Sequence, residues 1–279
     1  MRNRTFVLGV GEVVWDAPVA AADDSGLRGD GFFETVLCRG PEPVRLSAHL
    51  DRFERSAAAF GVDVDRAAWT GLAHEAVGAV PAGDEAVLRL TLARDGVGLV
   101  TVRPVPAGVR AGRDGVGVVT LARGTTTVPD APWLLTAAKT SSYAVNSAAA
   151  REAHRRGADD ALLVDADGLV LEAPTANLLW RAGGAWCTPP HAGRTVLPGT
   201  TLAAVAAGLG VVEADVRPGE LAGTDGAWLL SSVRGAAPVL RVDGARVPHD
   251  ARLTEVLRGI ALGTRREFPS GSGGATLGG

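Results

Sequence analysis

The sequence of 279 residues lacks the features that mark disulfide-rich, membrane-spanning and nucleic-acid-binding proteins. It has only two cysteines, Cys38 and Cys187, which are too few for a disulfide framework and lack metal-site spacing, so no metal is expected. Charged residues, Gly and Pro interrupt its hydrophobic runs, and none approaches the ~20 apolar residues of a membrane span. The formal net charge is −3, whereas nucleic-acid-binding domains are usually strongly basic.

No targeting segment is apparent at the N-terminus. The chain begins MRNRTFVLGVGEVV, where the apolar run is short, Glu12 interrupts it and no small-residue cleavage site follows. We therefore expect a cytoplasmic protein with neither a membrane nor a nucleic acid as partner.

Lysine is almost absent: Lys139 is the single lysine among 28 basic side chains, and the rest are arginine. A GC-rich genome explains this bias, which also favours Ala, Gly and Val. Arginine replaces lysine wherever only a positive charge is needed, but a guanidinium neither loses its proton near neutral pH nor condenses with an aldehyde. The one remaining lysine is therefore a candidate for primary-amine chemistry.

The first half of the chain predicts strands combined with two helices. Apolar and alternating segments predict strands over 5–14, 85–95, 98–106 and 116–124 and a hairpin over 31–47. Helical spacing predicts helices from Ser47 to Gly61 and over 65–79. Residues 1–124 are therefore expected to form a small α+β N-terminal domain.

The second half follows a polar, Pro-containing segment at 125–133, which is expected to be an interdomain linker. The patterns beyond it predict helices over 143–156 and 251–268, a loop entering a helix over 197–210, a strand over 227–233, and hairpins over 160–173, 177–189 and 238–247. Residues 134–268 are expected to form a larger α/β domain, and the Gly/Ser-rich tail 269–279 to be disordered.

Lys139 lies between this linker and a predicted helix, in the segment TAAKTSSYAVNS. A catalytic lysine needs a pKa lowered from about 10.4 toward ~7–8 by burial or by neighbouring positive charge. The apolar residues before Lys139 are compatible with burial, and a surface lysine is the alternative. Tyr143, the only tyrosine, would share a face with Lys139 if both lie on one helix; a half-buried aromatic is the alternative.

Three segments carry groups that suit a phosphate. In HLDR, Arg52 lies three residues after His49 on a predicted helix face and offers paired donors. In LPGTT, Thr200 and Thr201 follow a glycine and begin a predicted helix, which places their hydroxyls at its N-terminal end. In LLSSVRG, Ser231 and Ser232 lie at the end of a predicted buried strand. A solvated arginine and an ordinary helix cap are the alternatives.

Glu172 follows apolar residues at the end of a predicted hairpin strand. Its carboxylate is either a solvated edge group or the partner of a buried cation. Together these candidates suggest one ligand: an aldehyde for Lys139, a phosphate for Arg52 and the hydroxyl segments, and a protonated ring nitrogen for Glu172. Pyridoxal 5′-phosphate has all three groups.

The same motifs resemble the class IV aminotransferases, the fold-type IV pyridoxal-phosphate enzymes. The resemblance runs from about residue 5 to 250 and rests on RGDGFFET (28–35), HLDRFERSA (49–57), the segment from AKTSSYAVN to TANLLW (138–180), TPP (188–190) and LPGTT (197–201). It implies an α/β fold of the D-amino-acid aminotransferase type, with an α+β N-terminal domain, an α/β C-terminal domain, the cofactor between them and a homodimer completing the site.

The resemblance also implies roles for single residues. Lys139 matches the lysine that holds the cofactor covalently and moves the proton, and Glu172 matches the glutamate that pairs with the pyridine nitrogen. Arg52, Thr200 and Thr201 match phosphate-binding positions, and Ser231 and Ser232 fall at the remaining one. Leu202 stands where the family usually has an arginine.

The reaction that the pattern favours is the lyase reaction of the actinobacterial-type aminodeoxychorismate lyases. Phe33 stands where D-amino-acid aminotransferases have a tyrosine, and Tyr143 is the only phenol available for the pocket of a branched-chain enzyme. We therefore expect pyruvate elimination from the small-molecule substrate 4-amino-4-deoxychorismate to give 4-aminobenzoate, for folate or secondary metabolism. Phe33 and Arg94 are the candidate substrate-binding residues. A class IV aminotransferase acting on D-amino or branched-chain amino acids is the alternative.

Overall fold

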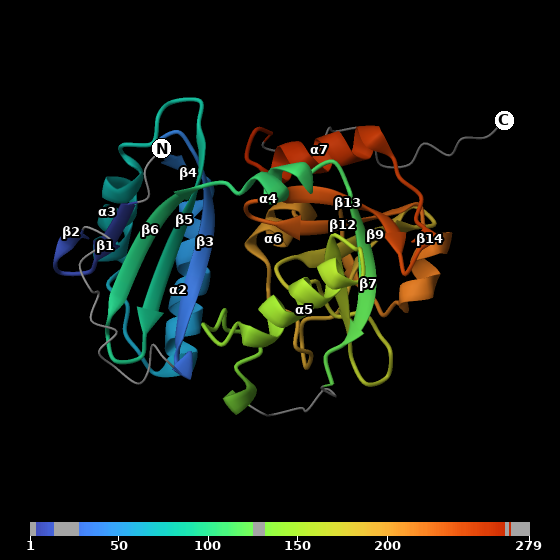
Figure 1. Cartoon of the computed structure of the whole chain (residues 1–279), viewed down its shortest axis with the longest axis horizontal. Helices are drawn as coiled ribbons and strands as arrows, with labels where there is room; N and C mark the ends of the chain where they lie inside the picture. Colours follow the sequence, from blue (N-terminus) through green and yellow to red (C-terminus); the bar gives the residue numbers. More distant parts are fainter. Residues whose placement is uncertain (1–3, 14–27, 125–131, 266–267, 269–279) are drawn as a thin grey trace. The chain divides into compact units, whose positions relative to one another are not determined.

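The computed structural model describes residues 4–13, 28–124, 132–265 and 268 (Figure 1). Its backbone divides into two compact units, Met1–Arg110 with Pro129–Ser147, and Ala111–Val128 with Ala148–Gly279. Most of the expected linker 125–133 and the expected tail 269–279 lie outside the described residues.

The first unit is built on an antiparallel six-stranded sheet in the order β2-β1-β6-β5-β3-β4. Its elements are β1 (Arg4–Val7), β2 (Gly11–Val13), β3 (Gly31–Arg39), β4 (Glu42–Pro43), α2 (Leu46–Phe60), α3 (Arg66–Val77), β5 (Glu85–Ala93), β6 (Gly98–Pro104) and η1 (Pro132–Leu134). The predicted combination of strands with two helices is confirmed here.

One face of this sheet carries the core of the unit. Along β5, Leu88, Leu90 and Leu92 are buried in a cluster that includes Phe53 of α2 and Trp69 of α3, while the side chains between them point to the opposite face. The apolar periodicity of the sequence therefore predicts which sheet face the helices cover.

Helix α2 begins differently from the expectation. Its N-cap residue is Arg45, in the left-handed conformation, and no side chain caps the first turn. Ser47, where the sequence suggested the helix would start, instead accepts a hydrogen bond on its hydroxyl from Arg66 of α3 at 2.9 Å. The C-terminal end is as expected, since Gly61 adopts φ 65° and caps the helix.

The second unit holds a mixed sheet in the order β11-β10-β9-β12-β13-β7-β8, with β14 paired to β13. Its strands are β7 (Val116–Ala122), β8 (Asp160–Val164), β9 (Asn177–Ala182), β10 (Ala185–Thr188), β11 (Val212–Glu213), β12 (Gly226–Ser231), β13 (Gly235–Val242) and β14 (Ala245–Arg246). Its helices are α6 (Thr200–Ala206), η2 (Pro218–Gly223) and α7 (Ala251–Ala261), while α4 (Ala107–Ala111) and α5 (Ala144–Arg155) extend across the chain divisions.

Strand β7 is parallel to both β8 and β13, and so belongs to this second sheet. The sequence had grouped residues 116–124 with the N-terminal half. The hairpin expected over 160–173 is present: backbone hydrogen bonds join Leu163 to Leu171 and Glu172, and Asp165 to Leu169, although β8 is its only named strand and the returning arm pairs through an isolated bridge between Val164 and Val170. In the turn, the carboxylate of Asp165 accepts hydrogen bonds from the backbone N–H groups of Asp167 and Leu169.

Candidate active site

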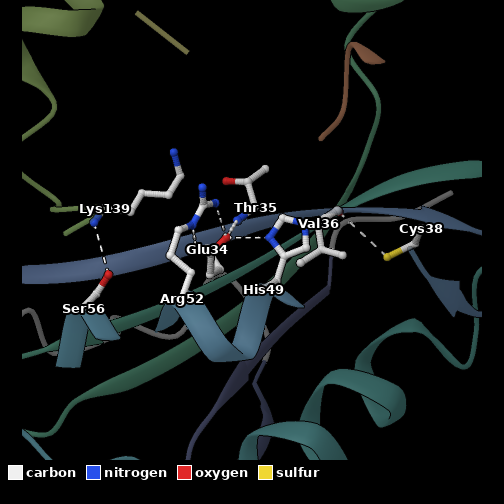
Figure 2. A network of polar contacts seen from close by, with 8 residues as sticks. All are labelled: Glu34, Thr35, Val36, Cys38, His49, Arg52, Ser56 and Lys139. Atoms are coloured by element: carbon white, nitrogen blue, oxygen red, sulfur yellow. Dashed lines mark hydrogen bonds and ion pairs between the residues drawn. The ribbon is translucent and has the colours of Figure 1, made fainter. Parts of the chain in front are cut away.

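A buried carboxylate on β3 joins two side chains of α2. Glu34, which has no exposed surface, accepts hydrogen bonds from Arg52 Nε at 2.6 Å and Nη2 at 2.8 Å, and from His49 Nδ1 at 2.7 Å (Figure 2). His49 and Arg52 lie three residues apart and face the same strand, as their spacing predicts. Glu34 itself was missed by the sequence reasoning, although a single acidic residue inside the apolar segment GFFETVL was a signal.

The surroundings of Glu34 and His49 shift the pKa values of both side chains, so that Glu34 is charged and His49 is uncharged at neutral pH. Burial alone would raise the pKa of Glu34, but the charge and hydrogen bonds of Arg52, followed by those of His49, lower it to about 2. Burial lowers the pKa of His49, which Glu34 only partly offsets. At neutral pH Glu34 is therefore an anion, and uncharged His49 donates from Nδ1.

Helix α2 also positions the backbone of Lys139. Ser56, one turn beyond Arg52, accepts a hydrogen bond on its hydroxyl from the Lys139 N–H at 3.2 Å (Figure 2). The Lys139 carbonyl accepts from Phe33 N–H of β3 at 2.9 Å. The backbone of the lysine is thus bonded on one side to α2 and on the other to β3.

The Lys139 side chain lies beside two aromatic rings. Its Nζ atom is 4.7 Å from the centroid of Phe33 and 5.6 Å from that of Tyr143, and the two rings meet edge to face with centroids 5.3 Å apart. Lys139 and Tyr143 do not share a helix, because α5 begins only at Ala144. They are brought together instead by Phe33, which is 4% exposed.

Arg89 of β5 is a further cation beside Phe33, and the sequence reasoning missed it. Its Cζ atom lies 4.0 Å from the centroid of Phe33, and its side chain lines a cavity of about 480 Å³ on the sheet face opposite α2. Desolvation by the surrounding side chains lowers the pKa of Arg89, and the nearby charge of Arg103 lowers it further. The available signal was a single charged residue, an arginine, in the mostly apolar segment AVLRLTL.

Arg94, the arginine that the sequence singled out, lies elsewhere in the same unit. Its side chain is 62% exposed, with Nη1 4.0 Å from Asp30 and Nε donating to the Phe60 carbonyl at 3.3 Å. It does not line the cavity. Its role in substrate binding stays a prediction.

Glu172 is the centre of a polar group within the second unit. Its Oε2 atom accepts hydrogen bonds from the Asn177 side chain and the Leu197 backbone N–H, each at 3.2 Å, and its Oε1 atom lies 3.8 Å from Arg123 Nη1. Glu172 is only 9% exposed. It is therefore a buried, oriented carboxylate rather than a solvated strand end.

The loop before α6 is packed against this group. Gly199 lies so close to Asn177 that an added Cβ would overlap the amide oxygen, which explains why glycine occupies this position. Thr200 and Thr201 follow in the first turn of α6, both buried, and Gly199 provides no side-chain cap. Leu202, at the position of the family's arginine, is buried in a cluster with Trp228 and Leu257.

Ser231 and Ser232 lie at the end of β12, where Ser231 pairs with Gly235 of β13. Both are partly exposed. The structure thus groups Lys139, Phe33, Tyr143 and Arg52 within the first unit, and the remaining expected cofactor contacts within the second.

Two features are absent from the described residues. The described part of the chain contains no group of three or more His, Cys, Asp and Glu side chains that could hold a metal ion. None of its helices combines the length and the apolar character required to cross a membrane.

Residues 31–242 match the family model described as amino-transferase class IV. The chain is 39% identical over 259 residues to a Mycobacterium tuberculosis protein named bifunctional aminodeoxychorismate lyase / D-amino acid transaminase, with 83% of this chain and 88% of that protein covered.

Solved structures agree with this match. A hypothetical aminotransferase from Mycobacterium tuberculosis, 34% identical, superposes in its PLP-bound form with a TM-score of 0.86, covering 94% of this chain and 100% of that one. Its form with alpha-ketoglutarate and PMP bound gives a TM-score of 0.85 at the same coverage and identity. The fold IV-transaminase CpuTA1 from Curtobacterium pusillum, also 34% identical, gives a TM-score of 0.86 and covers 95% of this chain and 99% of that one.

Proposed function

Because the chain belongs to the class IV aminotransferase family, we propose that it is a 4-amino-4-deoxychorismate lyase, which releases pyruvate and leaves 4-aminobenzoate. Membership makes it a fold-type IV enzyme that depends on pyridoxal 5′-phosphate. The observation that carries the proposal is the placement of Lys139 and Arg89 against one ring, Phe33. An amine-binding group and a carboxylate-binding group are thereby within reach of one small molecule.

The residues present fit the cofactor. Glu172 is a buried carboxylate with two N–H donors on one oxygen, as a partner for a protonated ring nitrogen requires. Thr200 and Thr201 place buried hydroxyls in the first turn of a helix without a side-chain cap. Arg52 is a buried guanidinium held in one orientation by Glu34, a geometry that suits phosphate oxygens.

Each residue then has a defined task. When bound, the cofactor supplies an electron sink for the electron pair that remains when a proton leaves the carbon bearing the substrate amine. Lys139 Nζ would hold the cofactor, and as a free amine it would take that proton. The bond from the ring carbon to the enolpyruvyl oxygen breaks with its electron pair going to the oxygen. The three-carbon unit gains a proton at its methylene carbon and leaves as pyruvate, and the ring becomes aromatic.

Phe33 and Arg89 hold the substrate near Lys139. The face of Phe33 is electron-rich and attracts both cations, so the ring fixes their side chains without neutralising either charge. Arg89 remains protonated at neutral pH despite its lowered pKa and can bind a carboxylate through two parallel hydrogen bonds. The homodimer implied by the family resemblance is part of this proposal. Size-exclusion chromatography with light scattering, which measures the molar mass of the holoenzyme in solution, tests it.

A second activity, transamination of D-amino acids, is favoured by one observation. The relative with 39% identity carries both activities in its name. The chain has Phe33 rather than a tyrosine, so it lacks a hydroxyl at that position for a substrate carboxylate. We therefore rank the lyase reaction first.

The test follows pyruvate with lactate dehydrogenase and NADH. Purified holoenzyme is given synthetic 4-amino-4-deoxychorismate, and separately D-alanine with 2-oxoglutarate. The lyase proposal predicts pyruvate and 4-aminobenzoate in equal amounts from the first mixture. Conversion of D-alanine with no 4-aminobenzoate from the first mixture would refute it.

Lys139→Arg is the matched variant, because it keeps the positive charge beside Phe33 but removes the primary amine. It should lose the visible absorption band of the covalently held cofactor and all turnover. Arg55→Lys, an exposed change on α2, should leave both unchanged. A coloured and active Lys139→Arg variant would remove Lys139 from the reaction.

A further inference from the structure

Ser56 is a polar side chain on the buried face of α2. It has no exposed surface, and its neighbours Phe53 and Ala57 belong to the apolar core of the first unit. Ser56 follows Arg52 by four residues, so the two side chains lie on one face of the helix. A hydroxyl buried in such surroundings costs free energy unless it forms a hydrogen bond. The group that is bonded to this hydroxyl therefore indicates the role of Ser56.

The hydroxyl of Ser56 is bonded to the backbone of the segment that carries the lysine. It accepts a hydrogen bond from the Lys139 N–H at 3.2 Å (Figure 2). The rest of this segment pairs with the start of β3: the Lys139 carbonyl accepts from the Phe33 N–H at 2.9 Å, and the Ser141 N–H donates to the Gly31 carbonyl at 2.7 Å. Ser56 thus supplies the hydrogen bond that joins the lysine backbone to the helix.

The same helix and strand hold Arg52. Its guanidinium is bonded to Glu34, which follows Phe33 on β3. Two adjacent residues of β3 therefore hold the lysine backbone and the arginine side chain. On α2, Arg52 and Ser56 are about one turn apart, which is about 6 Å along the helix axis. In Figure 2 the Lys139 side chain and the Arg52 guanidinium point in the same direction. Contacts with α2 and β3 thus set the position of the lysine relative to the guanidinium.

This relative position matters because the two groups that attach the cofactor belong to one rigid ring. In pyridoxal 5′-phosphate, the aldehyde and the carbon that bears the phosphate are substituents of neighbouring ring atoms. When one molecule is held at two points, the second contact is intramolecular, and its contribution depends on the placement of both protein groups. A displaced lysine would therefore lose the advantage of the double attachment, although each contact alone could still form.

We infer that Ser56 is a positioning residue, which holds Lys139 at the distance from Arg52 that a cofactor attached at both points requires. Ser56 acts through the backbone of Lys139. The inference rests on the proposed function, in which Lys139 holds the cofactor and Arg52 contacts its phosphate, and it does not depend on which reaction follows. The segment HLDRFERS then serves both points of attachment, with Arg52 for the phosphate and Ser56 for the lysine.

Calorimetric titration of the apoenzyme with three ligands tests this role. Pyridoxal 5′-phosphate offers an aldehyde and a phosphate, pyridoxal offers the aldehyde alone, and pyridoxine 5′-phosphate has the phosphate but an alcohol that does not condense with an amine. Ser56→Ala should weaken the binding of pyridoxal 5′-phosphate by about 10-fold or more and leave the other two affinities within about 2-fold. No effect on pyridoxal 5′-phosphate, or an equal effect on either of the other ligands, would overturn the inference.

Two further variants separate the hydrogen bond from packing and stability. Ser56→Thr keeps the hydroxyl and should bind pyridoxal 5′-phosphate within about 3-fold of wild type, whereas a loss as large as in Ser56→Ala would assign the effect to packing and overturn the inference. Thr254→Val removes another buried hydroxyl, which accepts from Trp228 Nε1 and donates to the Asp250 carbonyl, both at 2.8 Å. It should leave all three affinities within about 2-fold, and the Ser56→Ala pattern in this control would equally overturn the inference.

The binding measurements are independent of the reaction. A wild-type enzyme that releases no pyruvate refutes the lyase proposal, but the three ligands still report on the position of Lys139. Conversely, a wild-type enzyme that releases pyruvate, together with a Ser56→Ala variant that binds pyridoxal 5′-phosphate normally, refutes only the role of Ser56. Failure of the lyase proposal and failure of the Ser56 assignment therefore give different results.

Discussion

Replacing Glu34 with Gln should destabilise the protein far more than breaking a surface ion pair. The substitution keeps the shape of the side chain but removes the negative charge that compensates Arg52, which is 5% exposed. Breaking a buried pair by removing one partner costs about 3–5 kcal/mol, because the remaining charge stays buried without compensation. The pKa of Glu34 gives a similar figure: a shift from 4.5 to about 2 corresponds to about 3 kcal/mol.

The assay is urea unfolding followed by far-UV circular dichroism at pH 7, with excess pyridoxal 5′-phosphate. Glu34→Gln should lower the free energy of unfolding by about 3 kcal/mol. The control is Glu12→Gln in the pair Arg4–Glu12, which has an N–O distance of 2.9 Å but side chains 26% and 48% exposed. Solvent screens that exposed pair, so Glu12→Gln should change the free energy of unfolding far less than Glu34→Gln does.

The pH dependence supplies a second readout. Because the pKa of Glu34 is lower in the folded protein than in the unfolded chain, its stabilisation is complete above about pH 5 and is lost as the pH falls from about 4.5 toward 2. The difference between wild type and Glu34→Gln should therefore be constant from about pH 7 to 8 and should decrease below pH 4.5, as Glu34 becomes protonated in the folded wild type. Between these ranges the difference should be at least as large as at pH 7, because acid also destabilises the fold through the lowered pKa of His49, and the variant lacks the Glu34 charge that raises that pKa.

A double variant shows whether the cost comes from the unpaired charge. Adding Arg52→Met to Glu34→Gln removes the guanidinium that the first change leaves uncompensated. The double variant should therefore be less destabilised than the sum of the two single variants. A loss for Glu34→Gln no larger than for Glu12→Gln, or strict additivity in the double variant, would refute the reasoning.

Three further outcomes follow from the structure. Arg89→Met should raise KM for a carboxylate substrate about 10- to 100-fold, whereas Arg110→Met, an exposed change outside the cavity, should change it less than about 2-fold in steady-state kinetics. Gly199→Ala should displace Asn177 from Glu172, which should lower the free energy of unfolding by about 1–3 kcal/mol and weaken cofactor binding in a spectral titration of the apoenzyme. The control is Gly71→Ala in α3, where the added methyl group meets open space, and this change should stabilise the protein by about 0.5–1 kcal/mol. Burial raises the pKa of the Cys38 thiol to about 12 and also raises that of Cys187, so Ellman's reagent at pH 8 should detect no rapid reaction in the native protein and two thiols in guanidinium chloride.

Most elements of the fold could be predicted from local sequence patterns. The alternation along β5 and the helical spacing from Leu50 to Phe60 each specify one buried face, and the structure buries those faces in one cluster. The Asp243-Gly244 turn likewise joins β13 to β14 as expected. Such signals are local, because neighbouring residues alone determine which face is apolar.

Local sequence patterns do not predict which of the two sheets β7 joins. Its apolar pattern is that of any buried strand, and its partners β8 and β13 are parallel strands from later in the sequence. Parallel pairing needs a long connection and leaves no turn signature beside the strand. Strand identity is therefore predictable here, whereas strand assignment to a sheet is a long-range property.

The candidate site shows the same division at the level of side chains. The spacing of His49 and Arg52 predicts that they share a face of α2, but it does not reveal what they face. Their common partner, Glu34, comes from β3 and lies 18 residues before Arg52, so only the packing of α2 on the sheet brings the three together. The motifs GFFET and HLDR are thus one structural unit, in which the strand supplies the anion that orients the helix's arginine. The proposed phosphate contact of Arg52 would therefore require the orientation that Glu34 gives to its guanidinium.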